Sequence, residues 1–303
     1  MQWSVHIHGP ADLDGDLTLT RLARLNTSPR LAPALSAAAQ LANGAPFTHC
    51  AFGTEFCEHL LPSPESLAAA RDAARARSLR FTLLTPYVSN AGLARLRELF
   101  RLLDDDEVVF SDWGVLSLLR REFPRLVPIQ GRLLNKSLRD PRIMGVYAEA
   151  PAQPSTLAAL QRSNLDNPGY VSLLHRLGVA AVELDSLPQG TDLSFASNGL
   201  GVAVWFPFGF IATSRVCLAA GLHYRKPDKF TPGAPCRHEC QTHLVEYAYT
   251  NSPFANRDQK FYLKGNTYFY AHTEPMLGAL ASHAAAGRVS RLVFQPRLPM
   301  VAS

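Results

Sequence analysis

The stretch PFTHCAFGTEFCEHLLPSPESLAAARDAARARSLRFTLL at residues 46–84 has the pattern of a strand, a helix and a second strand. Residues 46–52 are apolar and predict a buried strand. Ser63 caps a helix that has proline at its first position and continues, rich in alanine, to about Arg77. Residues 79–84 predict the next strand. Such a unit indicates two parallel strands joined by a crossover helix.

The same alternation continues along most of the chain. Further strands are predicted at residues 3–8, 107–110, 126–129, 180–184 and 290–294. Further helices are predicted at residues 29–41, 90–103, 114–122, 168–177 and 274–285. About 300 residues of alternating strands and helices suit a closed, TIM-barrel-like (β/α) barrel, and a doubly wound open sheet is the alternative.

The C-terminal third is less regular. Residues 202–213 predict one long aromatic strand, and residues 222–235 a loop rich in proline and lysine. Residues 244–270 alternate polar and aromatic side chains, which favours antiparallel strands. We therefore expect one α/β-barrel domain over residues 1–303, with a loop and β-rich segment at 222–270 inserted near the cysteines discussed below.

Composition favours an ordered protein with a large core. The 303 residues are 47% hydrophobic and 18% charged. The N-terminus lacks the pattern of a secretory signal, and the most apolar run, residues 199–213, is interrupted by Pro207 and too short to cross a bilayer. These features predict a soluble, cytoplasmic protein without a membrane span. The net charge of +5 permits an anionic partner but does not require one.

The sequence contains five cysteines, and four of them are candidates for one metal site: Cys57, Cys217, Cys236 and Cys240. Cys57 and Cys217 each follow a predicted strand. Residues just past the strand C-termini of a barrel gather at one face, so these distant cysteines can meet there. Cys236 and Cys240 form a C-x3-C pair, and the proline-rich loop before them can bring them back toward Cys217.

Thiolates are soft ligands suited to iron–sulfur clusters and to zinc, and the spacing does not choose between the two. Ordinary buried cysteines are the other interpretation. Cys50 lies inside a predicted strand and is interpreted as a core residue. His243 could replace one cysteine as a zinc ligand.

Several catalytic motifs are absent from the sequence. It has no G-x-S-x-G elbow, no P-loop and no G-x-G-x-x-G after a strand. His238 and His243 are five residues apart rather than the four that a zinc-protease helix needs. A peptidase interpretation therefore has no nucleophile and base to rest on.

Three polar residues near the ends of predicted strands are candidates for direct catalytic contact with a substrate: Asp112, Asn135 and Glu183. Each also has a structural interpretation. Asp112 could cap the helix that starts near Gly114. Asn135 could order a loop, and Glu183 could pair with an arginine.

Several short runs of the sequence follow one another in a recognisable order. These are FGTEFC at 52–57, FSDWGVL at 110–116, GRLLN at 131–135, VEL at 182–184 and SRVC at 214–217, followed by Cys236 and Cys240. The series resembles peptidase family U-32, the collagenase-like peptidases, and within it the UbiV-like branch of ubiquinone biosynthesis. It covers roughly residues 53–245. The loop between Cys217 and Cys236 is longer than the pattern of that branch, and residues 247–270 match no part of it.

The resemblance implies a barrel-like fold and a 4Fe–4S cluster on Cys57, Cys217, Cys236 and Cys240. It also implies a heterodimer with a second U-32 family member that acts in oxygen-independent hydroxylation of a quinone precursor. Other family members are linked to hydroxylation of tRNA or rRNA. An RNA-modifying protein, a metal-binding partner subunit without turnover and a U-32 peptidase remain alternatives, so the substrate class is either a small molecule or RNA.

Overall fold

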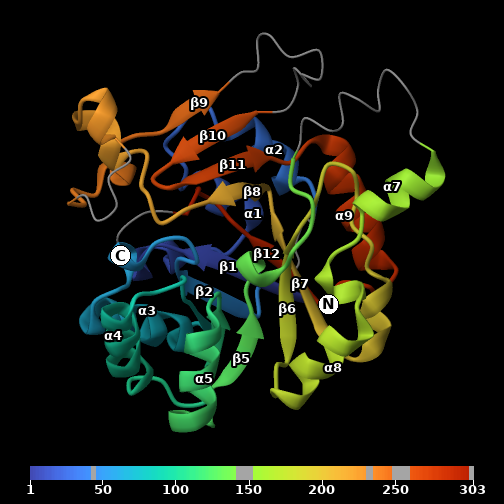
Figure 1. Cartoon of the computed structure of the whole chain (residues 1–303), viewed down its shortest axis with the longest axis horizontal. Helices are drawn as coiled ribbons and strands as arrows, with labels where there is room; N and C mark the ends of the chain where they lie inside the picture. The colour runs from blue at the N-terminus through green and yellow to red at the C-terminus, as the bar shows by residue number, and fades with distance from the viewer. Residues whose placement is uncertain (42–45, 141–152, 230–234, 248–259, 300–303) are drawn as a thin grey trace.

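The computed structural model describes residues 1–41, 46–140, 153–229, 235–247 and 260–299. Within these ranges eight parallel strands close into a barrel in the order β1-β12-β7-β6-β5-β4-β3-β2 (Figure 1). The strands are β1 (Gln2–Ile7), β2 (His49–Gly53), β3 (Arg80–Leu84), β4 (Glu107–Phe110), β5 (Val127–Gln130), β6 (Ala181–Asp185), β7 (Gly201–Phe206) and β12 (Arg291–Phe294). The predicted α/β barrel is confirmed, and the open sheet is excluded because β1 pairs with both β2 and β12.

Helices surround the barrel and follow its strands along the chain. They are α1 (Leu19–Ala23), α2 (Ala32–Ala39), α3 (Pro64–Ala76), α4 (Asn90–Phe100), α5 (Trp113–Glu122), α7 (Pro154–Leu160), α8 (Pro168–Arg176) and α9 (Glu274–Ala285). Local chemistry starts several of them. The Ser63 side chain accepts a hydrogen bond from the Ser66 N–H at the start of α3, and Ser89 caps α4 in the same way. No helix in the described ranges is long and apolar enough to cross a membrane.

The barrel strands are buried on both faces, as expected for a parallel sheet covered by helices. Inward side chains form a small core: Ala51, Leu84, Val109, Ile129, Ala203, Trp205 and Val293. Outward side chains such as Val5, Phe52 and Leu83 belong to the larger core that includes helix residues such as Leu67. Within the barrel, Arg291 binds Glu107 through two hydrogen bonds of 2.6 and 2.8 Å.

A second sheet lies at the end of the barrel where β7 stops (Figure 1). It is antiparallel, in the order β8-β11-β10-β9, with β8 (Phe208–Thr213), β9 (Val245–Tyr247), β10 (Phe261–Lys264) and β11 (Thr267–Ala271). The prediction of one strand over residues 202–213 is wrong. The chain turns at Pro207, and its two halves join different sheets. The extra sheet thus includes β8, which precedes the 222–270 segment.

Candidate metal centre

Cys57 follows the end of β2 at the carboxyl end of the barrel strands. The chain leaves β2 at Gly53, whose φ of +99° and close approach to the Leu84 carbonyl oxygen leave no room for a side chain. Burial raises the pKa of the Cys57 thiol to about 12, against a hydrogen bond from the His59 backbone, and Cys236, Cys240 and Cys217 raise it further.

The three late cysteines lie on segments connected to the second sheet. Cys217 follows β8, and its Sγ accepts a hydrogen bond from the Ala220 N–H at 3.4 Å. Burial raises its pKa, and Cys236 adds to that effect. Cys240 is buried in a short 3₁₀ turn, Glu239–Gln241. Burial raises its pKa to about 11, with Cys217 and then Cys236 as further causes.

The pKa of Cys57 responds to the other three cysteines, that of Cys240 to Cys217 and Cys236, and that of Cys217 to Cys236. The four thiols therefore lie within electrostatic reach of one another. They do not form a closed single-ion site. In the described ranges no three His, Cys, Asp or Glu side chains are arranged to hold a metal ion.

Asn266 connects the early and late cysteine segments. It lies in the turn between β10 and β11, and its Nδ2 donates to the Phe56 carbonyl at 2.8 Å and to the Ser214 carbonyl at 2.6 Å. Phe56 directly precedes Cys57, and Ser214 lies three residues before Cys217. This buried side chain therefore fixes the distance between the two segments, although nothing in the sequence singled it out.

Aromatic packing and a backbone hydrogen bond also hold the two cysteine-bearing segments against the second sheet. The Phe56 ring meets those of Phe210 in β8 and Phe269 in β11 at centroid distances of 5.4 and 5.2 Å. The Ala219 N–H donates to the Gly265 carbonyl at 3.2 Å. The Cys57 loop is thus packed against β8 and β11, and the segment that follows Cys217 is bonded to the turn between β10 and β11.

Below this sheet lies a buried charge network centred on Arg132. Arg132 Nε donates to Glu55 Oε2 at 2.7 Å and Nη1 to Asp185 Oδ1 at 2.9 Å. Its guanidinium lies over the Trp205 ring, 4.2 Å from the centroid. Arg139 also binds Asp185 and lies over the Phe210 ring at 4.0 Å. Two guanidinium groups therefore face two carboxylates inside the barrel mouth.

The three polar candidates occupy different environments. Asp112 caps α5, since its Oδ1 accepts the Gly114 N–H at 2.7 Å, as the structural interpretation proposed. Asn135 is buried after β5, and its Oδ1 has no hydrogen-bond partner among the described residues. Glu183 lies within β6 and accepts the Trp205 indole N–H at 2.9 Å rather than pairing with an arginine. Burial, and then the charge of Glu55, raise its pKa well above the usual value.

Cys50 and His243 have different environments. Cys50 is fully buried in β2 and belongs to the outer core, where burial raises its pKa. His243 Nδ1 lies 3.1 Å from the Glu239 carbonyl and 2.9 Å from Thr242 Oγ1. Its ring is thereby oriented by its own turn.

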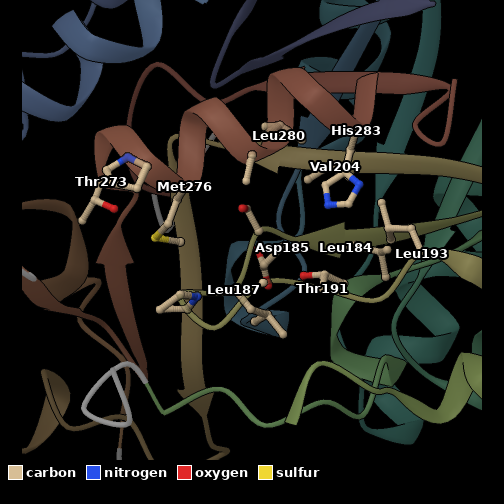
Figure 2. Close-up of a pocket in the computed structure, with 15 residues that line it drawn as sticks. Leu184, Asp185, Leu187, Thr191, Leu193, Val204, Thr273, Met276, Leu280 and His283 are labelled. Carbon is tan, nitrogen blue, oxygen red and sulfur yellow. The ribbon is translucent and has the colours of Figure 1, made fainter. Parts of the chain in front are cut away.

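A cavity of about 240 Å³ lies between α9 and the segment after β6 (Figure 2). Met276 and Leu280 from α9 line one side, and Leu184 and Val204 come from the barrel strands. Among the residues that line it, Asp185 is the carboxylate, and it is already paired with Arg132 and Arg139. The cavity is therefore apolar and separate from the cysteines.

Comparison with known proteins finds no matching family model and no matching curated protein. Solved structures show weak similarity. The U32 peptidase Mk0906 is 11% identical, with 97% of this chain and 92% of that chain covered and a TM-score of 0.40. A phosphodiesterase from Oleispira antarctica is 12% identical, with 68% and 84% covered and a TM-score of 0.36. A glycoside hydrolase family 18 N-acetylglucosaminidase from Paenibacillus barengoltzii is 11% identical, with 97% and 94% covered and a TM-score of 0.35.

Proposed function

We propose that this protein holds a 4Fe–4S cluster on Cys57, Cys217, Cys236 and Cys240 and works as a redox enzyme, or as a subunit of one, in an oxygen-independent hydroxylation. The observation that carries the proposal is the junction at Asn266, whose Nδ2 holds the segments of Cys57 and Cys217 together at the carboxyl end of the barrel. Active sites of α/β barrels form at this face. Zinc is the alternative metal.

The donor set fits such a cluster. Four thiols without a carboxylate match the ligands of iron–sulfur clusters. All four are free thiols, so each is open to the cluster. When bound, it supplies one-electron transfer. The Ala220 N–H directed at Cys217 Sγ is the kind of hydrogen bond that tunes a cluster's potential.

The other contributions to the site come from side chains and strands of the protein itself. Asn266 orients the two cysteine-bearing segments, and the second sheet covers the barrel mouth. The Arg132 network fixes buried charge beneath that sheet. We retain Asn135 and Glu183 as residues that could face a substrate, and assign Asp112 to the helix cap.

RNA modification is a second candidate function, and one observation favours it. Arg215, Arg225, Lys226, Lys229 and Arg237 are exposed on the segments that carry the late cysteines. Exposed cations near a site can bind phosphates. RNA retained at low salt and released at high salt would support this function. For a peptidase, the described residues offer no serine or cysteine hydrogen bonded to a histidine ring.

Anaerobic purification followed by iron, zinc and sulfide analysis tests the metal. We expect iron and inorganic sulfide in equal amounts and a brown protein. Each of Cys57→Ser, Cys217→Ser, Cys236→Ser and Cys240→Ser should lose most of the iron. Cys50→Ala, a change at the buried cysteine outside the site, should retain it.

Two results would overturn the cluster. Zinc without iron would replace it by a zinc site, and iron content unaffected by Cys57→Ser would separate the early cysteine from the late ones. Circular dichroism of each variant separates loss of metal from loss of fold. An anaerobic pull-down tests the proposed heterodimer with a second U-32 family member.

A further inference from the structure

A polar cavity of about 370 Å³ opens beside the cysteine neighbourhood. His8 borders it just past β1, Arg297 just past β12, and Lys264 at the end of β10. Gln241, which directly follows Cys240, also lines it. The cavity thus lies where the barrel mouth meets the second sheet, the usual place of a barrel active site, and its volume is that of a small-molecule pocket.

Nitrogen atoms around this cavity lack hydrogen-bond partners among the described residues. They are Gln241 Nε2, Arg297 Nε and both ring nitrogens of His8. Gln241 Nε2 and Arg297 Nε are donors, and a neutral histidine ring offers one donor more. Buried polar groups are normally paired, so several unpaired donors around one cavity indicate a missing acceptor.

The charged side chains that line the cavity, Lys264 and Arg297, are cationic. Arg297 is paired with Asp12, whose carboxylate also accepts the His8 backbone N–H at 2.7 Å. The Lys264 side chain is half-buried and makes no ion pair or hydrogen bond in the described ranges. A half-buried ammonium that lines a cavity beside unpaired donors favours a ligand with an anionic group, because charge-assisted hydrogen bonds are the stronger ones.

The rest of the lining mixes apolar residues with polar ones, the latter including Thr242 and His243. Leu25, Leu31 and Leu298 contribute to the wall, together with polar side chains of the loop before α2. A bare inorganic anion would leave this surface uncovered. A ligand with an acidic group at one end and an apolar body at the other would use both kinds of lining.

We propose that this cavity binds a small organic carboxylate, with its anionic group paired to Lys264 and its apolar body against Leu25, Leu31 and Leu298. Resting on the function proposed above, this assignment gives the substrate class of the same site. Lys264, His8 and Arg297 are then binding residues, and Gln241 links the ligand site directly to the cysteine-bearing turn.

Calorimetric titration with benzoate tests the proposal, with benzamide as its neutral isostere. We expect benzoate to bind the full-length protein at least tenfold more tightly than benzamide. Lys264→Met, which keeps the chain length and removes the charge, should weaken benzoate binding at least tenfold and leave benzamide unchanged. Lys260→Met is the matched control, because Lys260 is exposed and pairs with Glu246 at 3.3 Å.

Three outcomes would overturn the proposal. Benzoate that does not bind, or binds no better than benzamide, removes the anion site. Unchanged benzoate affinity in a folded Lys264→Met variant removes the assigned partner. Inorganic phosphate could also bind more tightly than benzoate and displace it. The cavity would then be a phosphate site in which the apolar side chains play no part.

The same titration on Cys57→Ser separates this inference from the proposed function, because Cys57 does not line the cavity. Benzoate binding in a protein that holds no metal in any variant would sustain the carboxylate site and end the cluster proposal. Normal iron content without benzoate binding would sustain the cluster proposal and end the carboxylate site.

Discussion

Arg132 is the residue on which the barrel mouth depends most directly. Its side chain is 1% exposed, and it binds Glu55 after β2 and Asp185 at the end of β6. Its backbone N–H also donates to Glu55 Oε1 at 2.9 Å. A charge buried this deeply is stable only with its partners, and the partners likewise need the charge.

Arg132→Met should therefore lower the free energy of unfolding by about 3–5 kcal/mol, since it leaves buried carboxylates uncompensated. Urea unfolding followed by circular dichroism measures the change. Arg97→Ala is the control: Arg97 binds Glu122 at 2.7 Å, but both side chains are over one-third exposed. That change should cost less than about 1 kcal/mol. Equal losses in the two variants would contradict the special role of Arg132.

At the scale of single elements, α5 tests the interpretation of Asp112. Asp112→Ala removes the acceptor for the Gly114 N–H and should cost about 1 kcal/mol in urea unfolding. Asp112→Asn keeps an acceptor and should cost much less. Iron content should be unaffected in both. A variant that loses activity with its stability intact would instead return Asp112 to the catalytic candidates.

Elements with strong local signals could be predicted from the sequence. The strands and helix of residues 46–84 were found because Ser63 and Pro64 mark a helix start and because the strands are apolar on both faces. Residues 202–213 were not resolved into β7 and β8. Both halves are apolar, and only tertiary structure assigns them to different sheets. The sequences of the short helices α1 and α7 have too weak a periodic pattern to predict a helix.

The site was predictable only in part for the same reason. Strand ends indicated that Cys57 and Cys217 could meet, because barrel topology gathers such positions. Asn266 and Lys264 could not be found in this way. Asn266 contacts Phe56, which is 210 residues distant in the chain. Lys264 is distinctive only because it lines the polar cavity beside unpaired nitrogen atoms of residues distant in the chain.

At the scale of the whole molecule, the barrel interior holds titratable groups from several strands. His6 in β1, His49 in β2 and His272 after β11 are buried. Burial is the main cause that lowers the pKa of each from 6.5 to about 4. All three are therefore neutral in the folded protein at pH values where the unfolded chain would protonate them.

The pH dependence of stability follows from this difference. The unfolded chain binds more protons than the folded one between pH 6.5 and about 4, so the stabilising effect is complete above 6.5 and is lost as the pH falls toward 4. Each histidine should cost about 2 kcal/mol at about pH 5. Glu183 acts with the opposite sign, because its raised pKa favours the folded state at low pH, but it contributes one proton against three.

Urea unfolding at a series of pH values from about 7.5 to 5 measures the effect, in a range where ordinary carboxylates are still ionised. We expect the free energy of unfolding to fall steadily below pH 6.5. His272→Gln should reduce the slope by about one proton, because both ring nitrogens of His272 lack partners in the described structure. A free energy of unfolding that does not change over this range would mean that the barrel interior accepts protons, contrary to the burial of these rings.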